Sequence, residues 1–506
     1  MVNLEYLKMS ASKKFLYRLK KFITAIPNKI LAFFKAIPRI FGKFFKKIYL
    51  EFFDIWNIFK KGDFKTRISF LIFGFGQILR GQILRGLLFL IFEIVFILYM
   101  ICFGWTYLAD FKTLGTVASE KIFNEELMIY ETKYYDNSML ILLYGLLTIF
   151  FIISFIYVWR LCIKQNGIIQ EMQELGIKLK HSKDDLRSLG DEQYYKTLLS
   201  VPLLGIVIFT VLPIAFMILV AFTNYDSGHL PPGKLFTWVG LTNFKKIFGL
   251  NENSGDVIFA RTFGDILIWT LVWAFFATFT NYFLGMIVAL MINKKGIKGK
   301  KIFRTILVMT IAVPQFISLL LVSRMFAEDG IINSILKQLS ILQPNGKIQW
   351  LTNGTLAKIM VILINIWVGI PYLMLITTGI LMNIPEDLYE SAKIDGATPL
   401  KTYMKITLPY MLFVTTPYLI TSFIANINNF NVIYLLTTGA PLTLEYANPA
   451  GKTDLLITWL YKLTMTQSSD YKMAAVIGIM VFIVISVFSL IVYNRSGSVK
   501  NEEDFQ

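Results

Sequence analysis

The sequence predicts an all-α polytopic membrane protein with eight transmembrane helices, and three observations support this. First, 55% of the 506 residues are hydrophobic and only 16% are charged, which is unlike a soluble globular protein. Second, eight apolar runs reach the length of about 20 residues that crosses a hydrocarbon core. Third, the connecting segments are alternately rich and poor in Lys and Arg. The runs lie near residues 86–108, 138–162, 198–222, 266–292, 303–326, 356–382, 410–437 and 473–493.

The Lys and Arg residues also predict the orientation of the chain. Residues 1–85 hold 18 of the 50 basic residues, and the short segment 293–304 holds another 6. Segments on the opposite side hold fewer, for example 2 in residues 327–355. Because basic segments stay on the cytoplasmic side, we expect a multi-pass protein of a bacterial cell membrane with both termini cytoplasmic. The net charge of +17 then reflects attraction to anionic lipid, so it gives no reason to expect nucleic-acid binding.

Four segments of different composition follow one another along the chain. Residues 1–85 interleave basic and aromatic residues at helical spacing, which favours amphipathic helices on the membrane surface over a specific docking site. This segment ends in an immediate repeat of GQILR, to which we assign no function. Residues 86–197 hold two transmembrane helices and a polar cytoplasmic linker, and residues 198–493 hold the other six helices. Residues 494–506 form a short cytoplasmic tail.

The sequence contains no complete motif for catalysis or metal binding. The AGKT at 450–453 resembles the end of a phosphate-binding loop, but Tyr446 stands where that loop needs a glycine. The only two histidines, His181 and His229, fall in different loops, which excludes a histidine-based metal site or catalytic triad. Glu93, deep in a predicted helix, could belong to a proton relay, although a packed and hydrogen-bonded side chain explains it more simply. We therefore expect a chain that is not an enzyme and that binds no metal or cofactor.

The cytoplasmic segment IPEDLYESAKIDGATPLKTYMKITLPYM (384–411) predicts two short helices held at an angle. The first, over residues 386–394, begins with acidic residues, which suit the positive end of a helix dipole. Gly396 is free to take a positive φ in the turn that follows. Thr398 can cap the second helix, and Pro409 is expected to end it. A plain amphipathic connector would show the same pattern, so spacing alone leaves the function of the segment open.

Within this segment, ESAKIDGA followed by ITLP closely resembles the EAA loop of ABC importer permeases. In that family the loop forms a coupling helix that docks into a cleft on an ATPase subunit. The resemblance implies a type I ABC importer permease core with this loop at residues 384–409, and a separate ATPase that uses the ATP. Ser391 replaces the usual alanine, which exchanges one small residue for another. The docking residues that the resemblance implies are Glu390, Ala392, Asp395, Gly396 and Ala397, closed by Ile406, Leu408 and Pro409.

Polar residues in the seventh predicted helix are unusual for an apolar run. If residues 410–437 form one helix, Ser422, Asn426 and Asn429 share a stripe along it. Because an amide offers both donors and an acceptor without charge, such a stripe could pair with the hydroxyl groups of a sugar. Hydrogen bonds between helices would explain the same residues equally well.

The sixth predicted helix carries a second polar feature, WVGIPYLML. Gly369 and Pro371 are expected to interrupt the helix, where broken backbone would need a cavity or a protein partner. Tyr372 supplies a flat ring and a hydroxyl, which suit the apolar face of a pyranose. A hydrophobic pocket with few polar groups would fit a neutral oligosaccharide.

Residues 360–493 resemble the larger, eight-span permease subunit of maltose and maltodextrin importers, in stretches such as GIPYLML and SFIANINNFNVIYLL. Ala425 replaces an aromatic residue of the enteric form, so one wall of the site would be built differently. The enteric form also carries a folded domain in an outer loop that spans only residues 223–265 in this chain, so the binding protein must be contacted differently. The residues that the resemblance places around a sugar midway through the membrane are Gly369, Tyr372, Ser422, Asn426 and Asn429.

The expected function is therefore that of the larger membrane subunit of an ATP-driven ABC importer for maltose or maltodextrin. The partners that the resemblance implies are a second homologous permease, two copies of an ATPase and an extracellular sugar-binding protein. Two alternatives stay open. One is an ABC permease for another oligosaccharide or glycoside, and the other is an ion-coupled secondary transporter.

Overall fold

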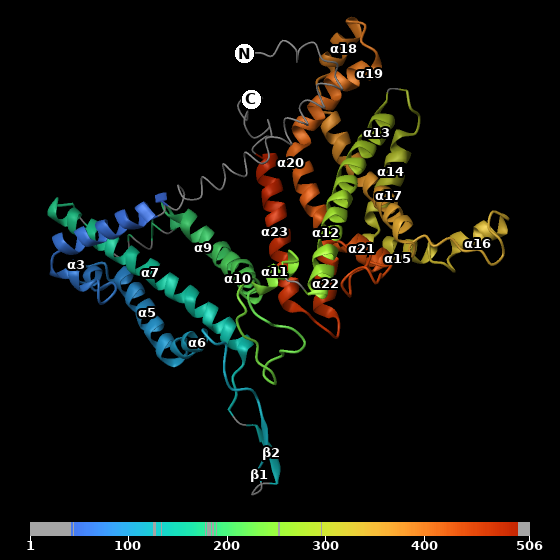
Figure 1. Cartoon of the computed structure of the whole chain (residues 1–506). Helices are drawn as coiled ribbons and strands as arrows, with labels where there is room; N and C mark the ends of the chain where they lie inside the picture. Colours follow the sequence, from blue (N-terminus) through green and yellow to red (C-terminus); the bar gives the residue numbers. More distant parts are fainter. Residues whose placement is uncertain are drawn as a thin grey trace, which may run out of the picture. The chain divides into compact units, whose positions relative to one another are not determined.

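The computed structural model describes most of the chain, and the described residues form helices with one small sheet (Figure 1). The predicted tail at 494–506 and residues 1–41 of the predicted membrane-surface segment lie outside the described residues. The described residues are 42–43, 45–124, 128–132, 134–177, 179, 184, 187–188, 190–250, 253–294 and 296–493.

Seven helical stretches among the described residues are long and apolar enough to cross a membrane. An eighth candidate is a pair of helices, α14 (Lys300–Ala312) and α15 (Gln315–Met325), which pass the same test together. The chain is thus an all-α polytopic membrane protein with seven or eight spans, as its composition predicts. The seven stretches are Ile83–Asp110, Ser138–Glu174, Tyr194–Val220, Ser254–Asn293, Gly354–Leu381, Pro399–Ile427 and Tyr471–Val492.

The fifth predicted helix, at 303–326, is not one straight span. Its two parts, α14 and α15, meet at an angle of 90°, and Val313 between them has extended backbone. Pro314 explains the break, because proline lacks an N–H group and disfavours helical backbone at the residue before it. The prediction of a single helix is therefore wrong in this region.

The chain forms two compact units, of which the first comprises Met1–Ala109 and Tyr144–Thr210. In this unit α4 approaches α5 so closely that a Cβ atom on Gly74 would lie 2.0 Å from the carbonyl oxygen of Gly86. Gly74 also has a φ of 76°, so glycine is required there by both space and backbone conformation. The elements of this unit are a helix over 45–61, α3 (Phe64–Ile68), α4 (Phe75–Leu79), α5 (Ile83–Tyr99), the π-helical turn η1 (Met100–Gly104), α9 (Tyr194–Ile206) and most of α6 (Trp105–Asp110), α7 (Ser138–Glu174) and the π-helical turn η2 (Val207–Val211).

The second unit comprises Asp110–Leu143 and Val211–Gln506. Helix α13 packs directly on α17, since a Cβ atom on Gly285 would lie 2.7 Å from the Cβ atom of Leu373. Its core includes Trp273 and Val361, both fully buried. The further elements of this unit are a hairpin of β1 (Lys121–Asn124) and β2 (Ile129–Thr132), and the helices α10 (Leu212–Val220), α11 (Thr242–Ile247), α12 (Ser254–Phe275), α13 (Asn281–Asn293), α14, α15, α16 (Ile331–Gln338), α17 (Gly354–Leu381), α18 (Glu386–Ile394), α19 (Pro399–Thr402), α20 (Leu408–Ile427), α21 (Phe430–Thr437), α22 (Leu456–Met465) and α23 (Tyr471–Tyr493), with the π-helical turns η3 (Phe276–Thr280) and η4 (Tyr403–Thr407).

The seventh predicted helix, at 410–437, is broken in the middle of its asparagines. Helix α20 ends at Ile427, and Asn429 caps the start of α21 by accepting a hydrogen bond from the Val432 N–H at 3.2 Å. Short amide side chains compete in this way with the backbone bonds of a continuous helix. The predicted stripe of Ser422, Asn426 and Asn429 on one helix is therefore wrong.

The sixth predicted helix, unlike the seventh, is continuous in the structure. Helix α17 runs from Gly354 to Leu381 without a break, and Pro371 lies buried inside it. The predicted interruption at Gly369 and Pro371 is therefore wrong. A proline removes one backbone hydrogen bond and strains the turn before it, and in a packed membrane helix the neighbouring helices compensate for this.

Candidate functional site

The predicted coupling loop joins α17 to α20 and lies at one end of the second unit, where α18 and α19 extend beyond the ends of α13 and α14 (Figure 1). Helix α18 begins after Pro385 with two acidic residues in its first turn. Gly396 has a φ of 68°, and the Thr398 hydroxyl accepts a hydrogen bond from the Lys401 N–H at 3.4 Å. The first short helix, the turn and the cap of the second helix are confirmed.

The expected end of this segment at Pro409 is wrong. Helix α19 continues through the π-helical turn η4 into α20, and Pro409 lies in the first turn of α20. A π-helical turn just before a proline lets a helix continue past it. Because α19, η4 and α20 are continuous, any force on the loop passes directly into a long helix.

The surface of the predicted coupling loop is largely exposed. Ile394 is 85% exposed and Leu400 is 72% exposed, which leaves apolar area uncovered at its tip. The hydroxyl groups of Tyr389 and Thr407 lie 3.1 Å apart and join α18 to η4. Of the predicted docking residues, Glu390, Asp395, Gly396 and Pro409 are exposed, and Ala392, Ala397, Ile406 and Leu408 are half-buried.

The predicted sugar site is built around η3, near the middle of the long helix Ser254–Asn293. The Asn426 amide donates a hydrogen bond to the Thr278 hydroxyl at 3.0 Å, and Asn429 donates to the Asn426 amide oxygen at 3.3 Å. The Trp273 indole also donates to the Asn426 carbonyl, at 3.1 Å. Although the helix breaks between them, the two predicted asparagines still touch.

Gly369 lies on α17 against the side chain of Asn281 on α13. A Cβ atom at position 369 would lie 2.4 Å from the Asn281 amide nitrogen, which leaves no room for any other residue. The glycine therefore permits a close contact between two helices. It does not create the kink that the sequence predicts.

Tyr372 on α17 and Ser422 on α20 share a neighbour that the sequence analysis does not single out. Tyr418, one turn before Ser422 on α20, interacts with both residues. Tyr372 is 52% exposed, so about half of its surface is uncovered by the rest of this chain. The five predicted residues thus fall into two small groups on α17, α20 and the start of α21.

Two further asparagines in this region leave part of their amide unpaired. Asn281 and Asn365 are each 6% exposed, and Asn365 precedes Gly369 by one turn of α17. Among the described residues, the Asn281 amide oxygen and the Asn365 amide nitrogen find no hydrogen-bond partner. A buried amide in an apolar helix is visible in the sequence, and TNYF and INIW could have identified both. We call Thr278, Asn281, Asn365, Asn426 and Asn429 the amide cluster.

A different polar cluster lies in the first unit. The Arg80 guanidinium, whose side chain is fully buried, donates to Asp63 at 2.6 Å, to Asn166 at 3.1 Å and to Gln173 at 3.0 Å. The Asn166 amide in turn donates to Gln77 at 2.7 Å. We call these five residues the arginine network. Gln77 and Arg80 belong to the first copy of the GQILR repeat, which therefore has a structural role.

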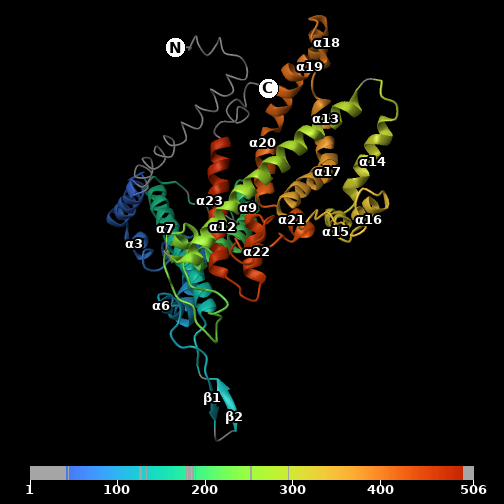
Figure 2. The same cartoon turned by 45° about the vertical axis from the view of Figure 1, so that its right-hand side comes forward.

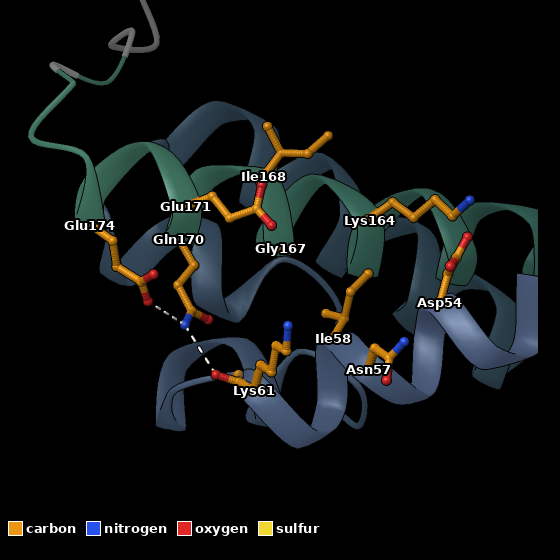
Figure 3. A pocket seen from close by; sticks show the side chains of 11 residues that line it. Asp54, Asn57, Ile58, Lys61, Lys164, Gly167, Ile168, Gln170, Glu171 and Glu174 are labelled. Carbon is orange, nitrogen blue, oxygen red and sulfur yellow. Dashed lines mark hydrogen bonds between the residues drawn. The ribbon is translucent and has the colours of Figure 1, made fainter.

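Next to the arginine network is a pocket of about 530 Å³ between the helix over 45–61 and the polar half of α7 (Figure 3). Gln170 on its wall donates to Glu174 at 2.8 Å and to the Lys61 carbonyl at 3.3 Å. Its lining mixes both signs of charge, with Lys61 and Lys164 facing Asp54, Glu171 and Glu174. None of the predicted sugar-site residues lies in this pocket.

The chemistry of the amide cluster is that of a neutral binding site. Its members offer amides and a hydroxyl, and they include no carboxylate, imidazole or thiol that could act as an acid, base or nucleophile. On α17, Tyr372 follows Gly369 by about one turn, and 52% of its surface is exposed. This combination can hold an uncharged molecule that carries many hydroxyl groups.

Comparisons with known proteins identify the family of this chain. The profile of the family described as "Binding-protein-dependent transport system inner membrane component" matches residues 281–497. The chain is 35% identical, over 445 residues, to the maltodextrin transport system permease protein of Streptococcus pneumoniae serotype 4, which covers 87% of this chain and 97% of that one. It is 34% identical, over 437 residues, to the galactooligosaccharides transport system permease protein of Bacillus subtilis, with 85% and 97% covered.

A third relative matches over a shorter region. The chain is 35% identical, over 271 residues, to the maltose/maltodextrin transport system permease protein of Escherichia coli strain K12, which covers 53% of this chain and 51% of that one. The matches in the first two relatives, in contrast, run through nearly the whole of each protein. The chain therefore belongs to the family of binding-protein-dependent ABC importer permeases that includes the maltodextrin and maltose permeases.

Proposed function

We propose that this chain is the larger membrane subunit of an ATP-driven importer that carries maltodextrin, including maltose, across the cell membrane. The observation that carries this proposal is the amide cluster, an uncharged set of hydrogen-bond donors and acceptors in which Asn365 shares α17 with the half-exposed Tyr372. The identity of 35% over 97% of a maltodextrin permease supports the same cargo.

The unpaired atoms of the amide cluster support a hydroxyl-bearing ligand. The Asn281 oxygen can accept a hydrogen bond and the Asn365 nitrogen can donate one, while a sugar hydroxyl both donates and accepts. Tyr372, with 52% of its surface exposed, offers a ring on which the apolar face of a glucose unit can lie. A charged substrate would find no opposite charge among these residues.

The predicted coupling loop supports an ATP-driven mechanism. Its exposed Ile394 and Leu400 need a protein partner, and an ATPase subunit with a matching cleft would cover them. This chain then hydrolyses no ATP itself, and it works with a second homologous permease, two ATPase copies and an extracellular sugar-binding protein. The loop faces the cytoplasm in this arrangement, as do both termini.

Two alternative functions are a different sugar cargo and an ion-coupled mechanism. A galactooligosaccharide is the second candidate cargo, because the galactooligosaccharide permease is 34% identical over 97% of its length. Ala425, which removes an aromatic wall, leaves room for such a sugar. An ion-coupled carrier is disfavoured by Glu93, whose carboxylate accepts a hydrogen bond from the Phe73 N–H at 2.8 Å and so has a structural partner.

The test uses the complete assembly in proteoliposomes. We expect binding protein loaded with maltotriose to stimulate both ATP hydrolysis and sugar uptake, and Glu390→Lys to abolish uptake while the sugar still binds. A galactooligosaccharide should stimulate weakly. Stimulation by the galactooligosaccharide alone would show that this sugar, and not maltodextrin, is the cargo. Uptake that collapses with an uncoupler at constant ATP would overturn the ATP-driven mechanism.

A further inference from the structure

The hairpin of β1 and β2 projects from the second unit at the end opposite to α18 and α19, and both views show it (Figures 1 and 2). The strands pair antiparallel, with Phe123 opposite Tyr130 and Lys121 opposite Thr132. Because α18 and α19 face the cytoplasm under the proposed function, this hairpin lies on the extracellular side.

The described residues of the hairpin expose an unusual amount of apolar and aromatic surface. Tyr130 is 70% exposed, Met128 76% and Ile129 52%. The rings of Phe123 and Tyr130 lie edge to face with centroids 5.1 Å apart, so together they form one aromatic ridge. A two-stranded hairpin with little else to pack against is marginally stable in water, and a partner that covers the ridge would stabilise it.

The base of the hairpin is held firmly. The Asp136 carboxylate accepts hydrogen bonds from the N–H groups of Thr116 and Val117 at 2.7 and 2.9 Å. The Asp136 N–H donates to the Val117 carbonyl at 2.8 Å, and the Ser119 N–H donates to the Pro232 carbonyl at 3.1 Å. The hairpin is therefore fixed to the outer loop that contains Pro232.

That outer loop is in turn fixed to a transmembrane helix. Asp226 pairs with Lys472 near the start of α23, and the rings of Tyr225 and Tyr471 stack with centroids 4.5 Å apart. A protein that binds the hairpin is thus connected to the transmembrane helix α23 through short, hydrogen-bonded segments. A flexible extension would not couple binding to the position of that helix.

The charge of the hairpin argues against the membrane as its partner. Residues 119–133 contain four Glu and two Lys, in a chain whose net charge is +17. An anionic lipid surface repels such a segment. Exposed tyrosine and phenylalanine are, in contrast, the side chains that dominate protein interfaces.

We propose that this hairpin is the docking element for the extracellular sugar-binding protein, with the ridge of Phe123 and Tyr130 buried in that contact. The proposal rests on the proposed function, and on a family that depends on a binding protein. The outer loop at 223–265 has no room for a folded docking domain, so a short, anchored hairpin takes that task.

The first experiment measures the ATPase rate of the complete assembly in nanodiscs against the concentration of maltotriose-loaded binding protein. The test variant is Phe123→Ser with Tyr130→Ser, and the matched control, Phe123→Tyr with Tyr130→Phe, keeps both rings. For the test variant we expect the half-saturating concentration to rise about tenfold, with the same maximal rate. The control should behave as the wild type.

A second variant guards against a local folding defect. Because Val117 and Asp136 are hydrogen bonded, residues 120–133 can be replaced by a short glycine-serine linker without separating the chain ends. This variant should also lose affinity for the binding protein. A photo-crosslinker at position 130 should capture the binding protein, while one at position 394, at the other end of the unit, should not.

The outcomes separate the two proposals. A half-saturating concentration that stays unchanged in both variants, or a crosslink from position 130 to lipid or to a second copy of the chain, overturns the hairpin proposal alone. A maximal rate that falls at unchanged half-saturation also overturns it. Absence of any stimulation of the wild type by the binding protein overturns the proposed function, and the hairpin proposal with it.

Discussion

The arginine network of the first unit and the amide cluster of the second both place polar groups inside an apolar protein, but they differ in how they are satisfied. In the network, each nitrogen of the Arg80 guanidinium has a partner, and Asn166 both donates and accepts. In the cluster, the Asn281 oxygen and the Asn365 nitrogen have none among the described residues. A closed network stabilises a fold, whereas unused donors and acceptors are open to pair with a ligand, as the proposed function requires.

The largest expected effect is the loss of stability when the arginine network is broken. Arg80→Leu removes the donor to the amide oxygens of Asn166 and Gln173, so we expect the first unit to lose about 3 kcal/mol of stability. The measurement is unfolding of the purified protein in SDS titrations. The matched control, Arg67→Leu, removes an exposed arginine that donates to two backbone carbonyls and lies over the Phe59 ring, and it should cost less than about 1 kcal/mol. Equal losses in the two variants would contradict a special role for the network.

The second prediction tests the open cluster. Asn426→Ala with Asn429→Ser keeps a helix cap at position 429 but removes both amides, so maltotriose uptake should fall about tenfold or more. Stability should change little, because each hydrogen bond inside a membrane contributes about 0.6 to 2 kcal/mol. Asn428→Ala, which alters an exposed neighbour, is the control and should transport normally. Uptake that survives in the double variant would mean that these amides only join helices.

The third prediction concerns the close contact behind the cluster. Gly369→Ala places a methyl group against Asn281, and we expect it to cost about 1 to 2 kcal/mol. Adding Asn281→Ala should restore most of that stability, which a double-mutant cycle measures. The control is Gly379→Ala on the same helix, where a Cβ atom meets open space. It should be neutral or slightly stabilising. If the cycle shows no coupling, the two helices do not pack as described.

The smallest expected effect concerns pH and the half-buried ion pair of Glu51 and Arg160. Hydrogen bonds from Arg160, and then from Lys164, lower the pKa of Glu51 from 4.5 to about 2. A lowered carboxylate pKa means that the pair contributes stability above pH 4.5 and loses it as the pH falls towards 2. The difference in thermal stability between wild type and Glu51→Gln should therefore shrink over that range. A constant difference would show that the pair does not form.

The predicted coupling loop could be read from the sequence almost residue by residue, because its determinants are local. A glycine that needs a positive φ and a threonine that caps a helix act within a few residues, and Gly396 and Thr398 do both. The contact between Asn281 and Gly369 joins two helices far apart in the chain, so no local pattern reveals it. The break at Asn428 was missed because mean hydropathy ignores the competition between amide side chains and the helix backbone.

The break between α20 and α21 has a consequence for how cargo can change during evolution. A helix end leaves carbonyl groups on one side and N–H groups on the other without helical partners, and the break brings both kinds together beside Asn426 and Asn429. Side-chain substitutions do not remove backbone groups, so under the proposed function these groups add sugar contacts to those of the Asn426 and Asn429 amides. Under the proposed function, neighbouring side chains such as Ala425 can then vary with the cargo while the backbone contacts stay the same.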